Sequence, residues 1–132
     1  MFPLIRRSVA PTADALSNFR KVTYLLPEGR PESKSEKLFR EQCETTDSMN
    51  HRFWSSQNIR FQKEREHYIK TFLKNNEGKS PSSEEMANFY SAFAKRNYQL
   101  MASYNQQWHK NNWLQIRLAI RVFFSRIFGN KF

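Results

Sequence analysis

The stretch NNEGKSPSSEE, residues 75–85, divides the chain between two long segments that contain no Pro or Gly. Its Asn residues and Gly78 suit the end of a helix, and Pro81 prevents a helix from continuing through it. Ser82 and Glu85 have the spacing of a capping box, in which each residue satisfies a backbone amide of the other. The stretch therefore predicts three elements: a helix over 33–75, a turn over 76–82 and a second helix over 83–128.

Aromatic residues recur at helical spacing in both segments. Trp54, Phe61 and Tyr68 follow one another every seven residues, and a second aromatic stripe runs through the later segment. Two long helices joined by a short turn should pack antiparallel and bury both stripes against each other. We therefore predict an all-α fold, a long antiparallel helical hairpin over 33–132. Its expected core comprises Trp54, Phe61, Tyr68, Phe72, Met86, Phe89, Tyr90, Phe93 and Tyr104.

Charge is distributed unevenly along the chain. The 132 residues carry a formal net charge of +10, yet residues 14–85 hold 13 basic and 12 acidic residues and are nearly neutral. Residues 86–132 hold seven basic residues and no acidic residue. Such a segment favours an acidic partner: nucleic acid, an anionic membrane surface or an acidic protein face.

The end of the second helix is also unusually apolar, which predicts an amphipathic C-terminal helical extension. Its Lys and Arg residues form a narrow stripe, with Arg126 opposite, and no apolar run is long enough to span a membrane. Such a segment suits a helix lying at a membrane surface or docked on a partner. The alternative is packing on the hairpin with the Arg stripe in water. The expected docking residues are Trp108, Lys110, Trp113, Arg117, Arg121, Phe124, Arg126 and Phe128.

The N-terminus has a different composition. Residues 1–13 are basic and acid-free, which is typical of a mitochondrial presequence, although a disordered basic tail has the same composition. Residues 14–32 contain one β-prone string, Val22 to Leu26, and no second strand candidate follows it. We therefore predict an extended arm over 14–32 that is not part of a sheet.

Catalytic motifs are absent from the sequence. It contains no Gly-rich phosphate loop, no GxSxG, no HExxH and no CxxCH. Its three His residues are widely spaced, and the single Cys43 has no base placed beside it. The sequence therefore predicts a binding or assembly role, without catalytic or metal-binding residues.

Four strings, in order, resemble one known family. They are SNFRKVTYLLPEG (17–29), FWSSQNIRFQKEREHYI (53–69), SEEMANFYSAFAKRN (83–97) and YNQQWHKNNW (104–113). Together they resemble the cytochrome c oxidase assembly factor 8 family, the apoptogenic mitochondrial proteins. The resemblance implies a non-catalytic mitochondrial protein, peripheral on the matrix side of the inner membrane. It implies a role in building or protecting respiratory complex IV, with oxidase subunits or assembly intermediates and anionic lipids as partners.

Three further hypotheses remain open. The family pattern implies a His near Met101 and a Tyr at the position of His109, so haem binding would have to use Met101 or His109 as a ligand. No other cofactor is expected. The basic, aromatic-rich C-terminal third also suits an RNA-binding accessory protein of mitochondrial translation, although helical spacing favours burial of the aromatics over nucleic-acid binding. A homo-oligomer is a further possibility.

Overall fold

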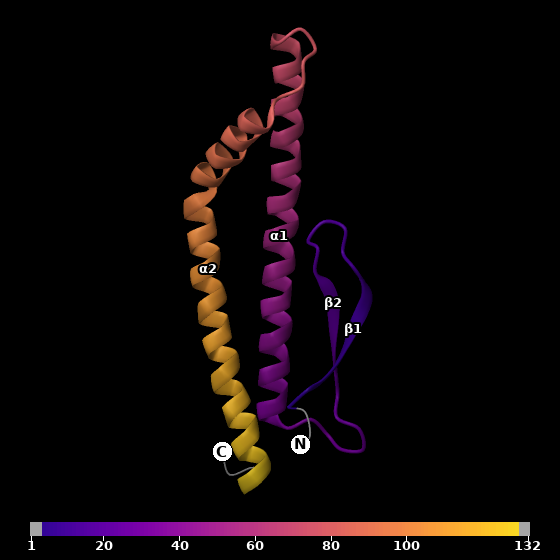
Figure 1. Ribbon diagram of the computed structural model, residues 1–132. Coiled ribbons are helices and arrows are strands. Elements are labelled where there is room, and N and C mark those ends of the chain that lie inside the picture. Colours follow the sequence, from indigo (N-terminus) through magenta and orange to yellow (C-terminus); the bar gives the residue numbers. More distant parts are fainter. Residues whose placement is uncertain (1–3, 130–132) are drawn as a thin grey trace.

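The computed structural model describes residues 4–129 and is mostly helical, as expected (Figure 1). Residues 1–3 of the predicted presequence and residues 130–132 of the predicted helical domain lie outside the described residues. The elements, in chain order, are the strands β1 (Arg6–Ala13) and β2 (Arg20–Leu25) and the helices α1 (Lys34–Asn75) and α2 (Ser83–Phe128).

The bounds of both helices follow from local hydrogen bonding. Ser33 and Ser82 are the N-caps, and each forms a complete capping box with the Glu three residues later. After α1 the chain reverses through Glu77 and Gly78, whose φ angles are 53° and 79°. The amide of Gly78 donates to the carbonyl oxygen of Leu73 at 2.9 Å. Both helices thus begin at a residue whose backbone amide is satisfied by a capping box.

The helix α2 is bent, and its C-terminal part runs beside α1 (Figure 1). Contacts from Tyr68 to Glu85, from Trp54 to Tyr104 and from Glu36 to Arg126 give the two helices opposite directions.

The aromatic residues expected in the core form a layer between the helices. Phe61 lies 5.2 Å from Phe93 between ring centroids, and Tyr68 stacks on Phe89 at 5.0 Å. Phe89 and Phe93 are buried, whereas Tyr90 is 42% exposed and covers Phe61 from outside. The remaining residues of the expected core are partly buried: Trp54, Phe61, Tyr68, Phe72, Met86 and Tyr104.

A second hydrophobic cluster lies at the other end of the helix pair. Phe39 and Cys43 of α1 pack with Val122 of α2, whose side chain is completely buried. Leu4, Ile5, Tyr24, Leu118 and Ala119 pack around these three residues. This cluster joins the N-terminal segment to both helices and fixes the rotation of α2 about its own axis.

The prediction that residues 14–32 lie outside any sheet is wrong. β2 pairs antiparallel with β1, with Arg7 opposite Tyr24 and Val9 opposite Val22. The partner strand precedes β2 in the sequence, within residues 1–13, where the basic and polar composition gives little β signal. The presequence interpretation of residues 1–13 stays a prediction.

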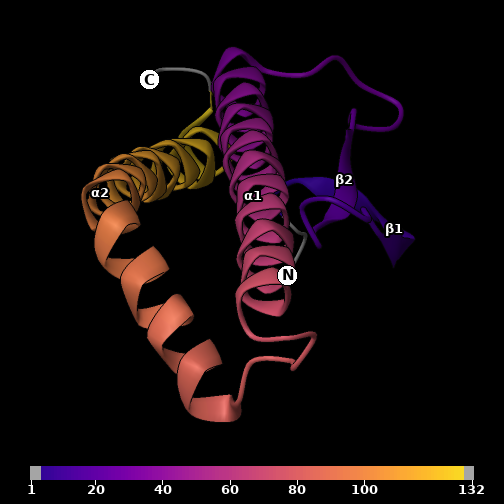
Figure 2. The ribbon, with the colours of Figure 1, turned by 90° about the horizontal axis from the view of Figure 1, so that it is seen from above.

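The small sheet lies on the side of α1 opposite to α2 (Figure 2). The turn between the strands is fastened to α1 by two bonds: Ser17 Oγ lies 2.8 Å from His51 Nδ1, and Asn58 donates to the carbonyl of Leu16 at 2.7 Å. Tyr24 of β2 donates to Asp47 of α1 at 2.6 Å. The sheet therefore covers one side of α1 and leaves the adjoining side open.

Candidate docking surface

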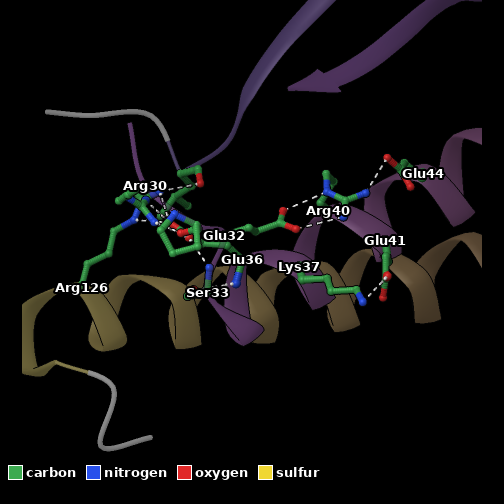
Figure 3. A network of polar contacts seen from close by, with 11 residues as sticks. Arg30, Glu32, Ser33, Glu36, Lys37, Arg40, Glu41, Glu44 and Arg126 are labelled. Atoms are coloured by element: carbon green, nitrogen blue, oxygen red, sulfur yellow. Dashed lines mark hydrogen bonds and ion pairs between the residues drawn. The ribbon is translucent and has the colours of Figure 1, made fainter. Parts of the chain in front are cut away.

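A buried carboxylate holds the last turn of α2 against the first turn of α1. Glu36 accepts two hydrogen bonds from Arg30, at 2.6 and 2.8 Å, and two from Arg126, at 2.9 and 3.2 Å (Figure 3). Arg126 also donates to the carbonyl oxygen of Leu4 at 2.9 Å. We call Arg30, Ser33, Glu36 and Arg126 the Glu36 cluster. The cluster connects both helices to the N-terminal segment.

The surroundings of Glu36 strongly favour its ionised form. Hydrogen bonding from Arg30 is the main cause that holds the pKa of Glu36 well below its usual range, and the Ser33 amide and Arg126 act in the same direction. Burial acts in the opposite direction but is outweighed. The side chain of Glu36 is 7% exposed, so its charge is available to these partners and hardly to solvent.

A second ion-pair group lies beside it on α1. Arg40 donates to both oxygens of Glu32, at 2.8 and 2.9 Å, and to Glu44 at 3.1 Å (Figure 3). The exposed residues Lys37 and Glu41 form a longer pair at 3.8 Å. The acidic residues in the N-terminal half of α1 are thus engaged, and α2 supplies no acidic residue beyond Glu85.

The C-terminal half of α2 presents a continuous apolar surface to solvent. Each of its seven side chains is between 44% and 66% exposed. An ordinary protein surface has single, scattered apolar residues, whereas these seven lie together. Phe124 stacks on Phe128 with ring centroids 5.9 Å apart. We call this surface the α2 apolar face, and it consists of Trp113, Ile116, Ile120, Phe123, Phe124, Ile127 and Phe128.

A basic stripe borders the α2 apolar face on one side. Lys110, Arg117 and Arg121 are exposed and fall within an arc of about 40° at 100° per residue. Over residues 4–129, no carboxylate lies within ion-pair distance of these three side chains. The combination of an apolar face and an unneutralised basic flank suits an anionic, partly apolar partner.

Two of the expected docking residues have different surroundings. Arg126 lies in the Glu36 cluster, on the side of α2 that faces α1, because it is opposite to the basic stripe on the helix. Trp108 lies about 140° around the helix from Trp113 at 100° per residue, with its ring against His109. Neither side chain belongs to the α2 apolar face.

The two haem candidates are not brought together. Met101 is partly buried and His109 is exposed, and the two lie eight positions apart on α2, or about 12 Å along the axis. A single iron therefore cannot bind both side chains. Between residues 4 and 129, no group of three or more His, Cys, Asp or Glu side chains could hold a metal ion. Haem binding through one of these residues stays a prediction.

Within the described part of the chain, neither α1 nor α2 has a stretch that is both long and apolar enough to cross a membrane.

Sequence reasoning missed the Glu36 cluster. One signal was available, since Ser33 and Glu36 have the same capping-box spacing as Ser82 and Glu85. The ion pair with Arg126 could not be found in this way, because it joins residues 90 positions apart.

Comparison with known proteins gives the family. The family model described as cytochrome c oxidase assembly factor 8 matches residues 7–128. The chain belongs to this family. The resemblance of the four sequence strings is thereby confirmed, and the match begins inside the predicted presequence and includes β2 and all of β1 except Arg6.

Curated members of the cytochrome c oxidase assembly factor 8 family are similar to this chain. The Bos taurus and Homo sapiens proteins of that name are 32% and 33% identical over 123 residues, or 86% of this chain. A COA8 family protein of Drosophila melanogaster, named as mitochondrial, is 31% identical over 115 residues. This chain covers 60%, 56% and 63% of the lengths of these three relatives. No solved structure matches the chain.

Proposed function

We propose that this chain is a non-catalytic mitochondrial factor that supports the assembly or protection of cytochrome c oxidase, peripherally bound to the matrix face of the inner membrane. The names of its relatives support the general role, since they are called assembly factors of that enzyme and, in the fly, a mitochondrial protein. The observation that carries the proposal is the α2 apolar face with its basic stripe.

The physical fit is to an anionic bilayer surface. A helix with an apolar face and Lys or Arg at its border lies in the plane of the headgroups, with the apolar side chains below them. The guanidinium groups of Arg117 and Arg121 can extend toward lipid phosphates while their aliphatic stems stay among the apolar side chains. Trp113 is suited to lie at the depth of the lipid headgroups. Each basic residue near an anionic surface contributes about 1 kcal/mol.

The rest of the fold supports this role by holding the surface outward. Val122 is anchored against Phe39 and Cys43, and Arg126 is anchored to Glu36. With these two residues facing α1, the apolar side chains between them necessarily face away from it. Bound at the membrane, the chain would present its remaining surface to oxidase subunits or assembly intermediates.

A substitution on the face tests the proposal in cells that lack their own copy of the protein. The double variant Ile116→Ser/Phe123→Ser changes two exposed side chains, so the fold should persist. We expect a salt wash without carbonate to release the double variant, but not the wild-type chain, from the membrane fraction. We also expect the level of assembled oxidase to be lower with the double variant. The matched control is Leu26→Ser, since Leu26 is 59% exposed and lies outside the face. Normal oxidase with the double variant at normal abundance would contradict the proposal.

A further inference from the structure

A groove lies between the two helices, away from the α2 apolar face. It has a volume of about 1290 Å³ and runs along α1 from Met49 to Glu64, opposite Leu100 to Gln107 of α2. The small sheet does not cover it, because none of the residues that line it comes from β1 or β2. The groove is therefore a concave surface of the helix pair that is distinct from the α2 apolar face.

The floor of the groove is apolar and firmly built. Phe53 of α1 stacks on Tyr104 of α2 with ring centroids 4.0 Å apart, and the Tyr104 hydroxyl accepts from Trp54 and donates to Asn50. Ile59 and Leu100 lie on either side and are 37% and 41% exposed. Apolar surface of these side chains is therefore exposed to water on both helices.

The rim of the groove is basic. Arg52, Arg60 and Lys63 line it from α1. The acidic residue in the lining, Glu64, is paired with Arg96 at 2.7 Å and so does not neutralise them. Arg60 donates to the neutral side chain of Gln57, and in residues 4–129 neither Arg52 nor Lys63 has a carboxylate within ion-pair distance.

We propose that this groove binds a helix of another protein that carries an apolar stripe flanked by acidic residues. The α1 side of the lining, from Met49 to Glu64, extends about 22 Å at 1.5 Å per residue, or four turns of a partner helix. Such a helix would cover Ile59, Phe53 and Leu100 with its stripe and set its carboxylates against the rim. The proposal goes beyond the membrane contact and does not depend on it.

Other occupants fit less well. The exposed apolar helix face that a second copy could offer is the α2 apolar face, and its flanking Arg117 and Arg121 would be repelled by the basic rim. A small ligand would stay largely in water, because the groove is open along its length, whereas small-molecule sites bury most of their ligand. A flat bilayer surface cannot reach the concave floor.

The test is a selection of displayed helical peptides by the purified full chain. The library keeps one apolar stripe long enough to span the groove and randomises the flanking positions among Glu, Lys and Ser. We expect enriched peptides to carry Glu at the flanks and to bind the double variant Arg52→Glu/Lys63→Glu at least tenfold more weakly. Leu100→Ser should also weaken the binding of the same peptides, because it removes apolar contact at the floor of the groove.

The matched control for charge is Lys70→Glu/Lys74→Glu, which makes the same change at exposed positions of α1 outside the groove. It should alter peptide affinity less than twofold, and circular dichroism should give the same helicity for all variants. A library without enriched sequences would overturn the proposal, as would enrichment of Lys at the flanks or equal binding by the groove variant and its control.

Discussion

Arg126 in the last turn of α2 donates two hydrogen bonds, at 2.9 and 3.2 Å, to a single oxygen of Glu36 in the first turn of α1. The two residues are 90 positions apart, so this contact joins the beginning and the end of the helical region. It also takes one Arg out of the exposed basic surface and sets the direction in which the α2 apolar face points.

Replacing Glu36 by Gln should destabilise the chain measurably. Gln can keep the capping box, but Arg30 and Arg126 would then face each other without the carboxylate that both contact. Hydrogen bonds to charged groups contribute about 1.5–3 kcal/mol, so we expect a loss of about 2 kcal/mol in the free energy of unfolding. Urea titration followed by circular dichroism measures this loss.

The matched control for that experiment is Glu41→Gln. Glu41 is exposed on the same helix and pairs with Lys37 at 3.8 Å, so its loss should change stability by less than about 0.5 kcal/mol. Equal effects of the two substitutions would mean that the Glu36 cluster has no special role.

Stability should depend on Glu36 in one pH range. Its pKa is lower in the folded chain than the ordinary 4.5, so the folded state favours the ionised form. The resulting stabilisation is fully present above pH 4.5 and disappears as the pH falls toward the folded pKa. The stability difference between the wild-type chain and Glu36→Gln should therefore be constant from neutral pH down to about pH 5 and shrink below that. A difference that grows on acidification would contradict this assignment.

Tyr104→Phe should remove two hydrogen bonds at the centre of the helix pair. The Trp54 ring nitrogen, 3.1 Å away, loses its acceptor, and Asn50, 2.9 Å away, loses its donor. Leaving such partly buried groups unpaired costs about 1–3 kcal/mol, which thermal or urea unfolding would detect. Tyr98→Phe is the control, because Tyr98 is 72% exposed and should have no measurable effect.

Cys43 should be an unreactive thiol in the folded chain. Burial raises its pKa to about 11, with Asp47 and Glu44 adding to the shift, and the side chain packs against Phe39 and Val122. Only the thiolate reacts with disulfide reagents, so at pH 8 we expect Ellman's reagent to react at least a hundredfold more slowly than with the urea-unfolded chain. Similar rates in the two states would show that the cluster around Cys43 opens readily.

The helices could be predicted from the sequence because their ends are set by local chemistry. Ser82, Glu85, Gly78 and Pro81 act within a few residues of one another, and the same signals bound both helices in the structure. Residues 45–50 include Thr45, Thr46 and Asn50, types that favour helix ends and turns, yet they do not interrupt α1. The hydroxyls of Thr45 and Thr46 bond to carbonyl oxygens one turn earlier.

The small sheet and the Glu36 cluster could not be predicted from the sequence. The sheet needs a partner strand with little β signal, and the cluster needs a partner residue that is distant in the sequence. β1 carries Arg6, Arg7 and Pro11, a composition that does not indicate a strand, and it forms one only beside β2. Helical periodicity places Arg126 on the opposite side of α2 from Arg117 and Arg121. It could not identify Glu36 as the partner of Arg126, because Glu36 lies on the other helix.

The binding of the purified chain to lipid vesicles tests the central claim most directly. Cosedimentation should compare phosphatidylcholine vesicles with and without phosphatidylglycerol. At about 1 kcal/mol per basic residue near the surface, Arg117→Glu/Arg121→Glu should weaken binding to the anionic vesicles at least tenfold. The control Lys70→Glu/Lys74→Glu, with the same charge change on α1, should alter it less than twofold. Equal loss in both double variants, or no loss in the first, would contradict the assignment of the C-terminal half of α2 as the membrane-docking surface.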